Sequence, residues 1–492
     1  MMDDNSSAPV PLPAPGREVE LKLLVDGGSA ERFLAAELLA TPQDRQSIRT
    51  IYYDTVDADL RAAGFILRVR AAGGAFKQTV KAAGSQTAGL FARPEWEQTV
   101  PGPAPMIDDT TPLKIFLGAR LSALAPVFEV RVERRTWLIE EGEATCELVL
   151  DCGSVIAGDR STPVCEFELE LRSGPARSLF DLARRIDAIA PVRPGLLTKA
   201  ERGFRLLGPA REVTRSEKPD LSPDMTSAVA FQRIAAACIR QFGLNEALID
   251  PTFPDALHQA RIGLRRLRSA MKVHKAMLAD ERFAAISADL AWLAGVLGHA
   301  RDLDVVARHL DDAALAQARS AAYDTVRVEL ASDRTRRLLL DLSEWLSTGA
   351  WLTRPETATL RQEPVRDSSA AILSRLRKKV RKAGRNLTEL SDEDRHTVRK
   401  TAKKLRYTAE FFAPLFDDKR GRRRRGAFFA AIEQFQDHLG ALNDMANLPS
   451  TLEGIGIAPP ADLAPDPERR KAMLDAAEAA HSDLSDTKAF WR

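Results

Sequence analysis

The alternation of apolar and polar residues changes its period along the chain. From Glu18 to about Val192, apolar and charged residues mostly alternate, as in β-strands, whose successive side chains point to opposite faces. From about Met225 onward, apolar positions recur every three to four residues in segments rich in Ala, Leu and Arg, which predicts α-helices. The pattern therefore predicts an α+β multidomain protein in which a sheet domain precedes an all-α domain.

Proline-rich stretches mark the boundaries of these regions. The N-terminal residues are rich in Pro and Ser, and Pro209, Pro219 and Pro223 interrupt the chain between the two periodic regions. Two helical patches, at 30–39 and 178–189, are expected at the periphery of the sheet domain. We therefore expect a flexible leader at 1–16, a sheet domain at 17–208, a linker at 209–224 and a helical domain at 225–492.

Charged residues occupy alternate positions of several predicted strands. Glu18, Glu20 and Lys22 share one face of the first strand, and Arg68 and Arg70 share a face of a later one. The same alternation occurs at Lys77, Thr79 and Lys81, at Arg93, Glu95 and Glu97, and at Glu166, Glu168 and Glu170. An ordinary antiparallel sheet would turn such a face toward solvent. Because both signs cluster over at least five strands, the pattern favours a closed antiparallel β-barrel whose lumen is a charged tunnel.

Acidic and basic groups enclosed together require a ligand that satisfies both. Neighbouring carboxylates bind hard cations such as Mg²⁺ or Mn²⁺, whereas Arg and Lys bind phosphate oxygens. Neither set could be buried alone, because an unpaired charge is costly to remove from water. A metal–polyphosphate ligand would neutralise both sets, and phosphoryl transfer depends mainly on such positioning and charge stabilisation.

The first strand carries a motif of a known family. Glu18-Val-Glu-Leu-Lys22 resembles the E-x-E-x-K signature of the CYTH superfamily, which includes triphosphate tunnel metalloenzymes, thiamine triphosphatases and class IV adenylate cyclases. The resemblance spans roughly residues 17–208. Further segments agree with the family in order: Tyr52–Thr55, Leu67–Arg70, Thr79–Lys81, Arg134 before Trp137, Leu150-Asp151, Cys165–Glu170 and Lys199–Arg202.

The resemblance implies a role for each charged position. The metal ions would be bound by Glu18, Glu20, Asp151, Glu166 and Glu168. The phosphates would be bound by Lys22, Arg68, Arg70, Lys81, Arg134 and Lys199, although an ordinary exposed lysine is the alternative for Lys199. Further candidates are Arg93, Glu170 and Arg202. The predicted catalytic residues are Glu18, Glu20 and Lys22, with Glu18 or Glu20 and one metal ion positioning the water that attacks the terminal phosphorus.

The helical region contains a repeated basic stripe. On a helix, His258, Arg261, Arg265 and Arg268 share one face, while Leu264, Leu267 and Met271 face the core. The stripe recurs at His396, Arg399, Lys403 and Arg406, and Leu297–Asp302 resembles Leu439–Asp444, with Asn443 where the first copy has Arg301. The repeats predict two pseudo-symmetric helical bundles whose stripes form one basic groove.

A basic groove suits a linear polyanion, although many charge runs are only solvated helix faces. Few acidic residues at i±4 neutralise these stripes, so they repel themselves without an anionic partner. Almost no aromatic residues interleave them, which argues against single-stranded nucleic acid but not against a duplex backbone. The region resembles the CHAD domain, a histidine-bearing helical domain often found after CYTH. The resemblance implies binding of inorganic polyphosphate, with the histidines donating to phosphate.

Composition adds constraints on location. The formal net charge is +2, and the four cysteines form no C-x-x-C pair, so a zinc site or a disulfide framework is not expected. We see no secretory signal and no apolar run of 18 residues, so we expect a cytoplasmic protein without a membrane partner. The resemblance of the helical domain to CHAD further implies association with polyphosphate granules.

The combined resemblance is to the bacterial CYTH–CHAD inorganic triphosphatases. It implies metal-dependent hydrolysis of inorganic triphosphate to diphosphate and phosphate, with Mg²⁺ or Mn²⁺ as cofactor. The alternatives are another CYTH activity, such as thiamine triphosphatase or adenylate cyclase, a non-enzymatic polyphosphate-binding scaffold, and a nucleic-acid-binding helical domain.

Overall fold

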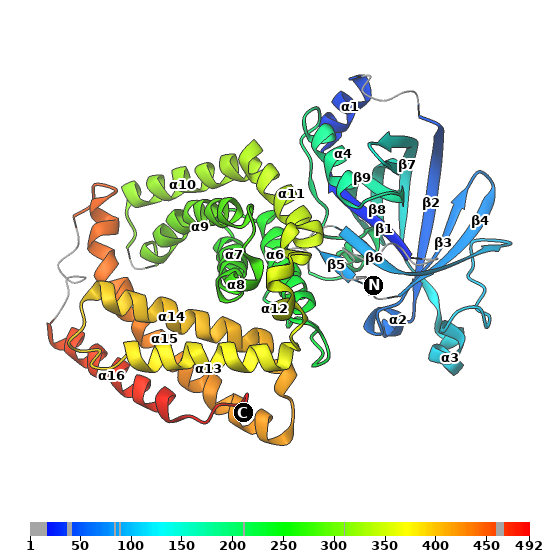
Figure 1. The fold of residues 1–492 in the computed structure, drawn as a ribbon. Helices are drawn as coiled ribbons and strands as arrows, with labels where there is room; N and C mark the ends of the chain where they lie inside the picture. The colour runs from blue at the N-terminus through cyan, green and yellow to red at the C-terminus, as the bar shows by residue number, and fades with distance from the viewer. Residues whose placement is uncertain are drawn as a thin grey trace. The chain divides into compact units, whose positions relative to one another are not determined.

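The structure is a computed structural model that describes residues 17–36, 42–82, 85–87, 90–209, 212–308, 310–458 and 467–492; residues 17–18, 85–87 and 90–94 are described as backbone only. The predicted leader at 1–16 lies outside the described residues. The chain forms two compact units, shown as a ribbon in Figure 1. The first comprises residues 1–212 and 332–353, and the second comprises residues 213–331 and 354–492.

An antiparallel sheet organises the first unit. In the described residues it has ten strands, in the order β10-β1-β9-β8-β7-β2-β3-β4-β6-β5, and β1 also pairs with β6. The predicted antiparallel sheet is therefore confirmed, while its closure into a barrel stays a prediction. The strands are β1 (Arg17–Leu24), β2 (Asp44–Asp54), β3 (Ile66–Ala72), β4 (Ala75–Lys81), β5 (Ser85–Thr87), β6 (Leu90–Val100), β7 (Ala125–Glu141), β8 (Ala144–Ala157), β9 (Arg160–Ser173) and β10 (Arg193–Pro194).

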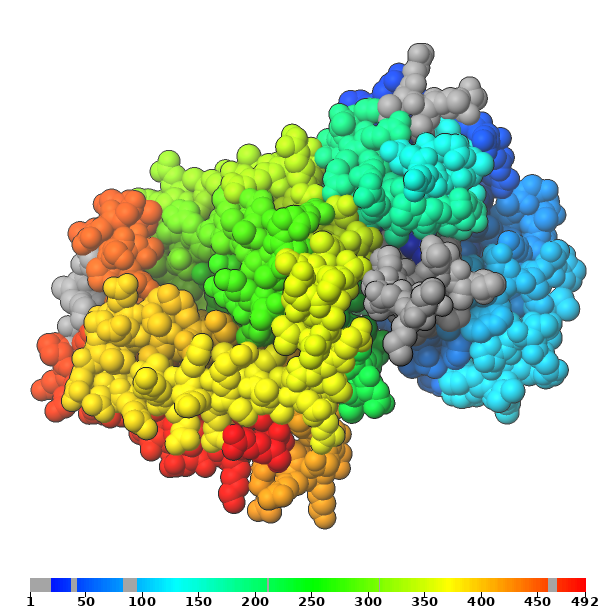
Figure 2. Space-filling model, in the orientation of Figure 1, coloured from blue at the N-terminus to red at the C-terminus, as the bar shows by residue number. Residues whose placement is uncertain are grey.

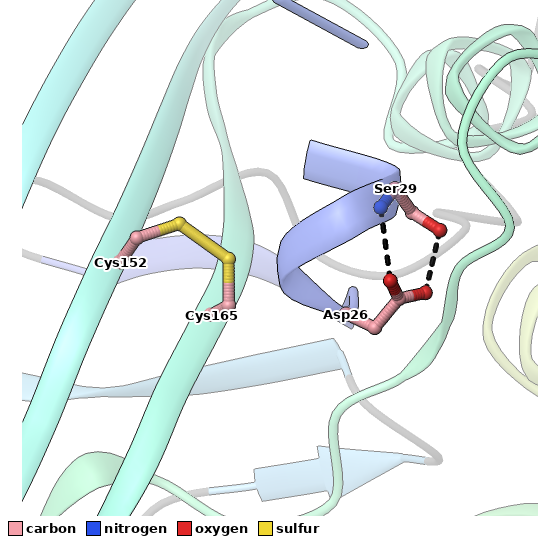
Figure 3. The surroundings of a disulfide bond; sticks show 4 residues. All are labelled: Asp26, Ser29, Cys152 and Cys165. Carbon is pink, nitrogen blue, oxygen red and sulfur yellow. Dashed lines mark hydrogen bonds between the residues drawn. A yellow bond between two sulfur atoms is a disulfide. The ribbon is translucent and has the colours of Figure 1, made fainter. Parts of the chain in front are cut away.

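Short helices cover the apolar face of this sheet. The helix α4 lies over it with an apolar side in which Leu179, Phe180 and Ile186 are fully buried, and these residues share one core with Leu21 and Leu23 of β1. The helix α1 begins at Asp26, whose carboxylate accepts a hydrogen bond from the backbone N–H of Ser29 (Figure 3). The helical segments of this part of the unit are α1 (Gly27–Ala35), α2 (Asp59–Ala62), α3 (Leu113–Leu117), η1 (Gly118–Ala123), α4 (Arg177–Asp187) and α5 (Lys199–Leu206).

The opposite face of the sheet is charged, and its central residues are shielded from solvent. Glu20 and Lys22, which alternate with the apolar core residues of β1, are only 7% and 3% exposed. Asp151 and Glu166 are fully buried at 0% exposure. An outer charged face of an ordinary sheet would be hydrated, so this burial decides against that interpretation of the alternating pattern.

One segment of the first unit comes from far along the chain. The helix α11 (Asp333–Thr348) contributes Leu340 to the core under α4, and η2 (Ala350–Leu352) follows it. Three ion pairs join α11 to α4: Arg184 pairs with Asp341 at 2.8 Å and with Glu344, and Arg336 pairs with Asp187 at 2.8 Å. This packing could not be predicted from the pattern of apolar residues, because α11 has the same helical period as its neighbours.

The second unit is helical, as expected. The stripe helix α7 packs against α6 and α9, and the second stripe helix, α14, packs against α13 and α15. The same set of neighbours around both stripe helices is what the predicted repeat requires. The helices are α6 (Ser227–Glu246), α7 (Pro254–Val273), α8 (Lys275–Leu278), α9 (Phe283–Val306), α10 (Ala313–Ala331), η3 (Pro355–Thr357), α12 (Ala358–Gln362), α13 (Val365–Ala383), α14 (Asp392–Phe412), η4 (Ala413–Phe416), α15 (Lys419–Glu453) and α16 (Pro467–Asp486).

Apolar residues fill the interior of this unit. Leu264, Leu267 and Met271 of α7 are buried, as predicted, and so is Leu405 of α14. In the space-filling view the helices of the unit form a packed surface, with α13 and α14 in yellow and α16 in red (Figure 2). The buried apolar side of each stripe helix therefore fixes the direction in which its basic residues point.

One helix among the described residues is long and apolar enough to cross a membrane. It is α9, in which a third of the most apolar 18-residue window is buried (33%). A single such helix is weak evidence, since a core helix passes the same test, and α9 packs against α7 and α10. The expectation that the protein has no membrane partner stays a prediction.

The cysteines depart from expectation. Cys152 on β8 and Cys165 on β9 are direct cross-strand neighbours and form a disulfide (Figure 3). Cys146 and Cys238 are free and buried. The expectation of no disulfide framework therefore has one exception, which spacing could not reveal because strand register alone brings these two residues together.

Candidate functional site

Strand register brings the predicted charged residues of the first unit together. Lys22 of β1 lies opposite Glu168 of β9, and Glu166 of β9 lies opposite Asp151 of β8. Asp151 in turn lies opposite Arg134 of β7. Four neighbouring strands thus place acids and bases side by side, because direct cross-strand neighbours have their Cβ atoms about 5 Å apart.

Lys22 is the first centre of this arrangement. Its Nζ lies 2.8 Å from Glu20 Oε1 and 3.2 Å from Glu166 Oε1, and it also pairs with Glu168. Burial by itself would lower the pKa of Lys22, but the charges of Glu166, Glu168 and Glu20 outweigh it and raise the pKa well above its usual value. Lys22 therefore stays charged at physiological pH.

Lys199 is the second centre, and a helix start places it. Thr198 caps the N-terminus of α5 by accepting a hydrogen bond from Glu201 N at 3.1 Å, and Glu201 completes the capping box. The Nζ of Lys199 lies 2.7 Å from Asp151 Oδ2 and 2.7 Å from Glu166 Oε1. Lys199 is 8% exposed, so the alternative of an ordinary exposed lysine is wrong.

Arg134 holds the acids from the other side. Its Nε and Nη2 donate to the two oxygens of Asp151 at 2.8 and 2.6 Å, and Nη2 also donates to Glu168 at 3.1 Å. Burial would raise the pKa of Asp151, but the charges of Lys199 and Arg134 and the hydrogen bond from Arg134 outweigh it and lower the pKa. Glu168 behaves in the same way. We call this set the acid–base cluster: Glu20, Lys22, Arg134, Asp151, Glu166, Glu168 and Lys199.

Arg68 and Arg70 form a second, less neutralised group. Arg68 Nη2 is 3.9 Å from Glu95 Oε1, and Lys81 Nζ is 2.8 Å from Glu95 Oε2. The charge of Arg68, with burial and then Arg134, lowers the pKa of Arg70 to about 10. The Nε atoms of Arg68 and Arg70 are buried and have no hydrogen-bond partner among the described residues. Buried donors of this kind are costly unless a ligand accepts from them.

The remaining residues of the predicted set divide clearly. The side chain of Glu18 lies outside the described residues, although its backbone pairs with Arg93. Arg202 reaches Glu166 Oε2 at 3.4 Å, so this further candidate adjoins the cluster. Glu170 instead pairs with Arg172 at 2.7 Å, outside it.

Sequence analysis did not predict the contacts of two residues, Glu95 and Tyr52. Glu95 joins Lys81 and Arg68, although it stood in the alternating pattern without an assigned role. Tyr52 lies opposite Arg68, and its ring stacks on Phe128 with centroids 4.6 Å apart. In the same motif, Asp54 accepts hydrogen bonds from the backbone N–H groups of Leu60 and Arg61 at 2.9 and 3.0 Å, which is a structural role at the start of α2.

The acid–base cluster has the donor chemistry of a hard-cation site. Glu20, Asp151, Glu166 and Glu168 offer carboxylate oxygens, the ligands that Mg²⁺ and Mn²⁺ prefer. Over the described part of the chain, however, no three carboxyl, imidazole or thiol groups are gathered around one point. The ammonium groups of Lys22 and Lys199 lie between the acids instead. The residue types therefore fit such a cation, with Lys22 and Lys199 as the groups now pairing with its prospective ligands.

In the second unit the two stripes meet. Burial, then Arg265, Arg399 and Arg261, lower the pKa of Lys403 to about 6, so the charges of α7 and α14 act on one another. The compensating acids are few: Arg261 Nη2 is 3.6 Å from Asp302 Oδ1, and Asp444 acts on Arg399 and Lys403. We call this set the basic surface: Arg261, Arg265, Arg399 and Lys403.

The other predicted stripe residues differ between the two halves. Burial, followed by the charges of Arg301 and Arg265, lowers the pKa of His258 to about 4, so its imidazole is neutral at physiological pH. His396 Nδ1 instead lies 2.6 Å from Asn443 Oδ1 and lines a cavity of about 290 Å³. The pKa of Arg268 is lowered by burial and by Arg265, whereas Arg406 pairs with Glu410 at 2.9 Å.

Comparison with known proteins shows which domain families the chain matches. The family model of the CYTH domain matches residues 16–204, and that of the CHAD domain matches residues 233–453. An inorganic triphosphatase of Haemophilus influenzae is 30% identical over 208 residues, covering 40% of this chain and 57% of that protein. The match thus spans little more than half of that relative.

Two further similarities extend over a larger share of the matched proteins. An uncharacterized protein of Mycobacterium tuberculosis is 26% identical over 455 residues, covering 82% of this chain and 84% of that protein. A crystal structure of the CHAD domain from Ricinus communis is 26% identical and covers 57% of this chain and 99% of that chain, with a TM-score of 0.45. With both family models matched in this order, the chain belongs to the proteins that carry a CYTH domain followed by a CHAD domain.

Proposed function

We propose that this protein hydrolyses inorganic triphosphate to diphosphate and phosphate at the acid–base cluster of its CYTH domain. The observation that carries the proposal is the pair of buried Nε atoms in Arg68 and Arg70, which have no hydrogen-bond partner among the side chains and backbone that the structure describes, beside a group of buried carboxylates. Phosphate oxygens would satisfy these donors, and cations would match the acids. The similarity to an inorganic triphosphatase of Haemophilus influenzae supports the same substrate.

The balance of charge around the site favours an anionic ligand. Seven described basic side chains face five carboxylates, an excess of two positive charges. The basic side chains are Lys22, Arg68, Arg70, Lys81, Arg134, Lys199 and Arg202, and the acids are Glu20, Glu95, Asp151, Glu166 and Glu168. A polyphosphate that carries a divalent cation would neutralise both groups at once.

We infer that the sheet encloses this site as a closed tunnel. In the strand order, β1 and β6 stand near opposite ends, and β1 pairs with both β9 and β6. A ring of paired strands with the charged faces inward would keep water from competing for the phosphate oxygens. This geometry supports the closed-barrel prediction.

The site would be metal-dependent. Glu20, Glu166 and Glu168 would hold Mg²⁺ or Mn²⁺, with Asp151 and Glu18 as further ligands. Such an ion, when bound, polarises phosphoryl oxygens and lowers the pKa of a bound water. Arg68, Arg70, Lys81 and Arg134 would bind and orient the phosphates. Lys22 and Lys199 would turn from the carboxylates toward phosphate oxygens, and Glu20 would orient the attacking water.

For the CHAD domain, we propose binding of inorganic polyphosphate at the basic surface. The pKa of Lys403 is lowered to about 6 because burial and three arginines act on it, so an anion at this place would relieve the repulsion. With its two basic stripes, the CHAD domain would keep a cytoplasmic enzyme on polyphosphate, including polyphosphate granules.

A substrate panel tests the enzymatic proposal. The full chain with Mg²⁺ or Mn²⁺ should release phosphate from triphosphate faster than from ATP or thiamine triphosphate, and chelation should stop the reaction. Asp151→Asn should abolish release, whereas Lys77→Ala, which removes an exposed ion pair with Glu97 on the same sheet, should not. Preferred thiamine triphosphate or ATP turnover would indicate another CYTH activity. No turnover of any of them would indicate a binding scaffold.

A retention assay tests the CHAD proposal. Wild-type protein should be retained on immobilised polyphosphate to higher salt than on duplex DNA, and Lys403→Ala should shorten that retention. Stronger retention on DNA would identify a nucleic-acid-binding domain instead.

A further inference from the structure

Two glycines stand at equivalent places in the helical repeat. Gly298 in Leu297–Asp302 corresponds to Gly440 in Leu439–Asp444, and they lie on α9 and α15, which pack against the stripe helices α7 and α14. Gly298 is buried and Gly440 is partly buried. Glycine in the middle of a helix is less stable than alanine by about 0.5–1 kcal/mol, so some contact should justify its presence at both places.

The contact at each glycine is a stripe arginine. A Cβ atom at Gly298 would lie 3.5 Å from Nη2, 3.7 Å from Nε and 3.9 Å from Cζ of Arg261. Both nitrogens lie nearer than Cζ, so the guanidinium group turns its Nε–Nη2 edge toward the glycine. At Gly440 the corresponding neighbour is Nη2 of Arg399, at 4.0 Å. The repeat therefore preserves the pairing of glycine with arginine as well as the two sequence motifs.

An aspartate lies beside each of these glycine–arginine pairs. Asp302 lies one turn after Gly298 and is 3.6 Å from Nη2 of Arg261. Asp444 holds the same place after Gly440, and its charge acts on Arg399. The Nε of Arg399 is buried and has no hydrogen-bond partner in the described part of the chain, so it retains a donor for a ligand.

We propose that Gly298 and Gly440 are positioning residues that seat the guanidinium groups of Arg261 and Arg399 for polyphosphate binding. This inference rests on the proposed function of the CHAD domain. Each glycine leaves the helix surface bare, the guanidinium covers it, and the aspartate one turn later fixes its direction. A larger side chain at either glycine would occupy the place of the guanidinium and displace it from the basic surface.

The first test measures polyphosphate binding by the full chain. Gly298→Leu should weaken binding about tenfold, the order expected for loss of one hydrogen bond to a charged group, and should lower the salt dependence by about one counterion. Gly298→Ala brings its Cβ only to contact distance and should give a smaller loss. Gly295→Leu is the matched control, since nothing lies within 4 Å of a Cβ at that exposed position of the same helix. Equal binding by Gly298→Leu and wild type would overturn the proposal.

A double-mutant cycle shows whether the glycine acts through its arginine. Arg261→Ala combined with Gly298→Leu should bind no more weakly than Arg261→Ala alone, because the same contact is already lost. Fully additive losses would mean that the leucine acts by another route. The pair Gly440→Leu and Arg399→Ala repeats the test in the other half, with Gly426→Leu as its control.

Chemical modification separates this inference from the proposed function. Without polyphosphate, phenylglyoxal should modify Arg261 several-fold faster in Gly298→Leu than in wild type, as read by mass spectrometry. An unchanged rate of modification would show that Gly298 does not position the guanidinium group of Arg261. If wild type fails to bind polyphosphate but the modification rate rises, the proposed ligand is wrong and the seating of Arg261 stands.

Discussion

In the CYTH domain the ammonium group of Lys22 lies among three carboxylates, whereas in the CHAD domain that of Lys403 is surrounded by the charges of three arginines. The same side chain consequently has its pKa raised in the first place and lowered to about 6 in the second. Burial opposes the charge in both. The difference lies in the neighbours: Lys22 is paired with carboxylates, whereas Lys403 lies among arginines with few acids to offset their charge.

The largest expected effect comes from breaking the paired site. Glu166 is fully buried, at 0% exposure, and pairs with both Lys22 and Lys199. Glu166→Gln removes the negative charge that both ammonium groups share. Removing one partner of a buried ion pair costs about 3–5 kcal/mol, so urea unfolding should show a large loss of stability. Triphosphate hydrolysis should fall by at least about 100-fold, the scale of losing one transition-state contact.

The control for that variant is Glu97→Gln, whose ion pair with Lys77 is exposed. It should cost no more than about 1 kcal/mol. If Glu97→Gln and Glu166→Gln were equally stable, the buried pairing would not stabilise the CYTH domain as inferred.

The next effect separates binding from stability inside the CYTH domain. Arg68→Met removes a guanidinium group whose buried Nε has no hydrogen-bond partner in the described part of the chain, and it removes the charge that lowers the pKa of Arg70. Hydrolysis should therefore fall about 100-fold, while the melting temperature should change little, because the ion pair of Arg68 with Glu95 is long at 3.9 Å. Activity assays and calorimetry on one preparation would check this, and a clear loss of melting temperature would show that Arg68 is structural.

The pH dependence of polyphosphate binding is a smaller effect. In the free protein Lys403 loses its proton above about pH 6, and a bound anion would favour the charged form. Affinity should therefore be highest below pH 6 and fall with rising pH, by at most about tenfold per unit for one linked proton. Lys403→Arg should flatten the profile between pH 6 and 9.

The sign of the matching stability effect follows from the same pKa. Because the folded pKa of Lys403 lies below its unfolded value, the unfolded chain binds more protons between those two values. Without polyphosphate, the contribution of Lys403 to stability should rise with pH above about 6. Lys22, with its raised pKa, contributes stability that is fully present below the unfolded lysine value and is lost only at higher pH. A binding or stability profile that does not change on Lys403→Arg would contradict the assignment.

The smallest effect concerns the support of Arg68. Burial by itself would lower the pKa of Arg68, but a hydrogen bond with Tyr52 and the charge of Glu95 outweigh it and raise the pKa. Tyr52→Phe would keep the stacking on Phe128 and lose that hydrogen bond, which is worth about 1 kcal/mol. We expect about a threefold to tenfold rise in KM for triphosphate with little change in kcat. A fall in kcat alone would indicate that Tyr52 acts on the reaction step.

The period of the sequence indicated much of this arrangement. The strict alternation at Glu20 and Lys22 and at Glu166 and Glu168 predicted which residues share a face, because side chains alternate along a strand. It could not reveal which base pairs with which acid, since that depends on register between strands far apart in the chain. For this reason sequence analysis assigned no role to Glu95, although its carboxylate pairs with both Lys81 and Arg68.

Long-range packing explains the other omissions. The disulfide of Cys152 and Cys165 depends on the register of β8 and β9, and α11 is indistinguishable in period from helices of the second unit. In the helical region the repeat itself was readable, and with it the basic stripes. The seat of Arg261 on Gly298 was not, because it depends on how two helices touch.

The position of α11 has a consequence for dissecting the molecule. The polypeptide crosses between the two units three times, near residues 212, 331 and 353, so neither unit is one continuous segment of the chain. A fragment ending at residue 208 would contain every described strand of the sheet yet leave out Leu340 and Asp341, which pairs with Arg184. Swapping such a fragment between homologues would therefore transplant an incomplete module, and exchanges should carry residues 332–353 with it.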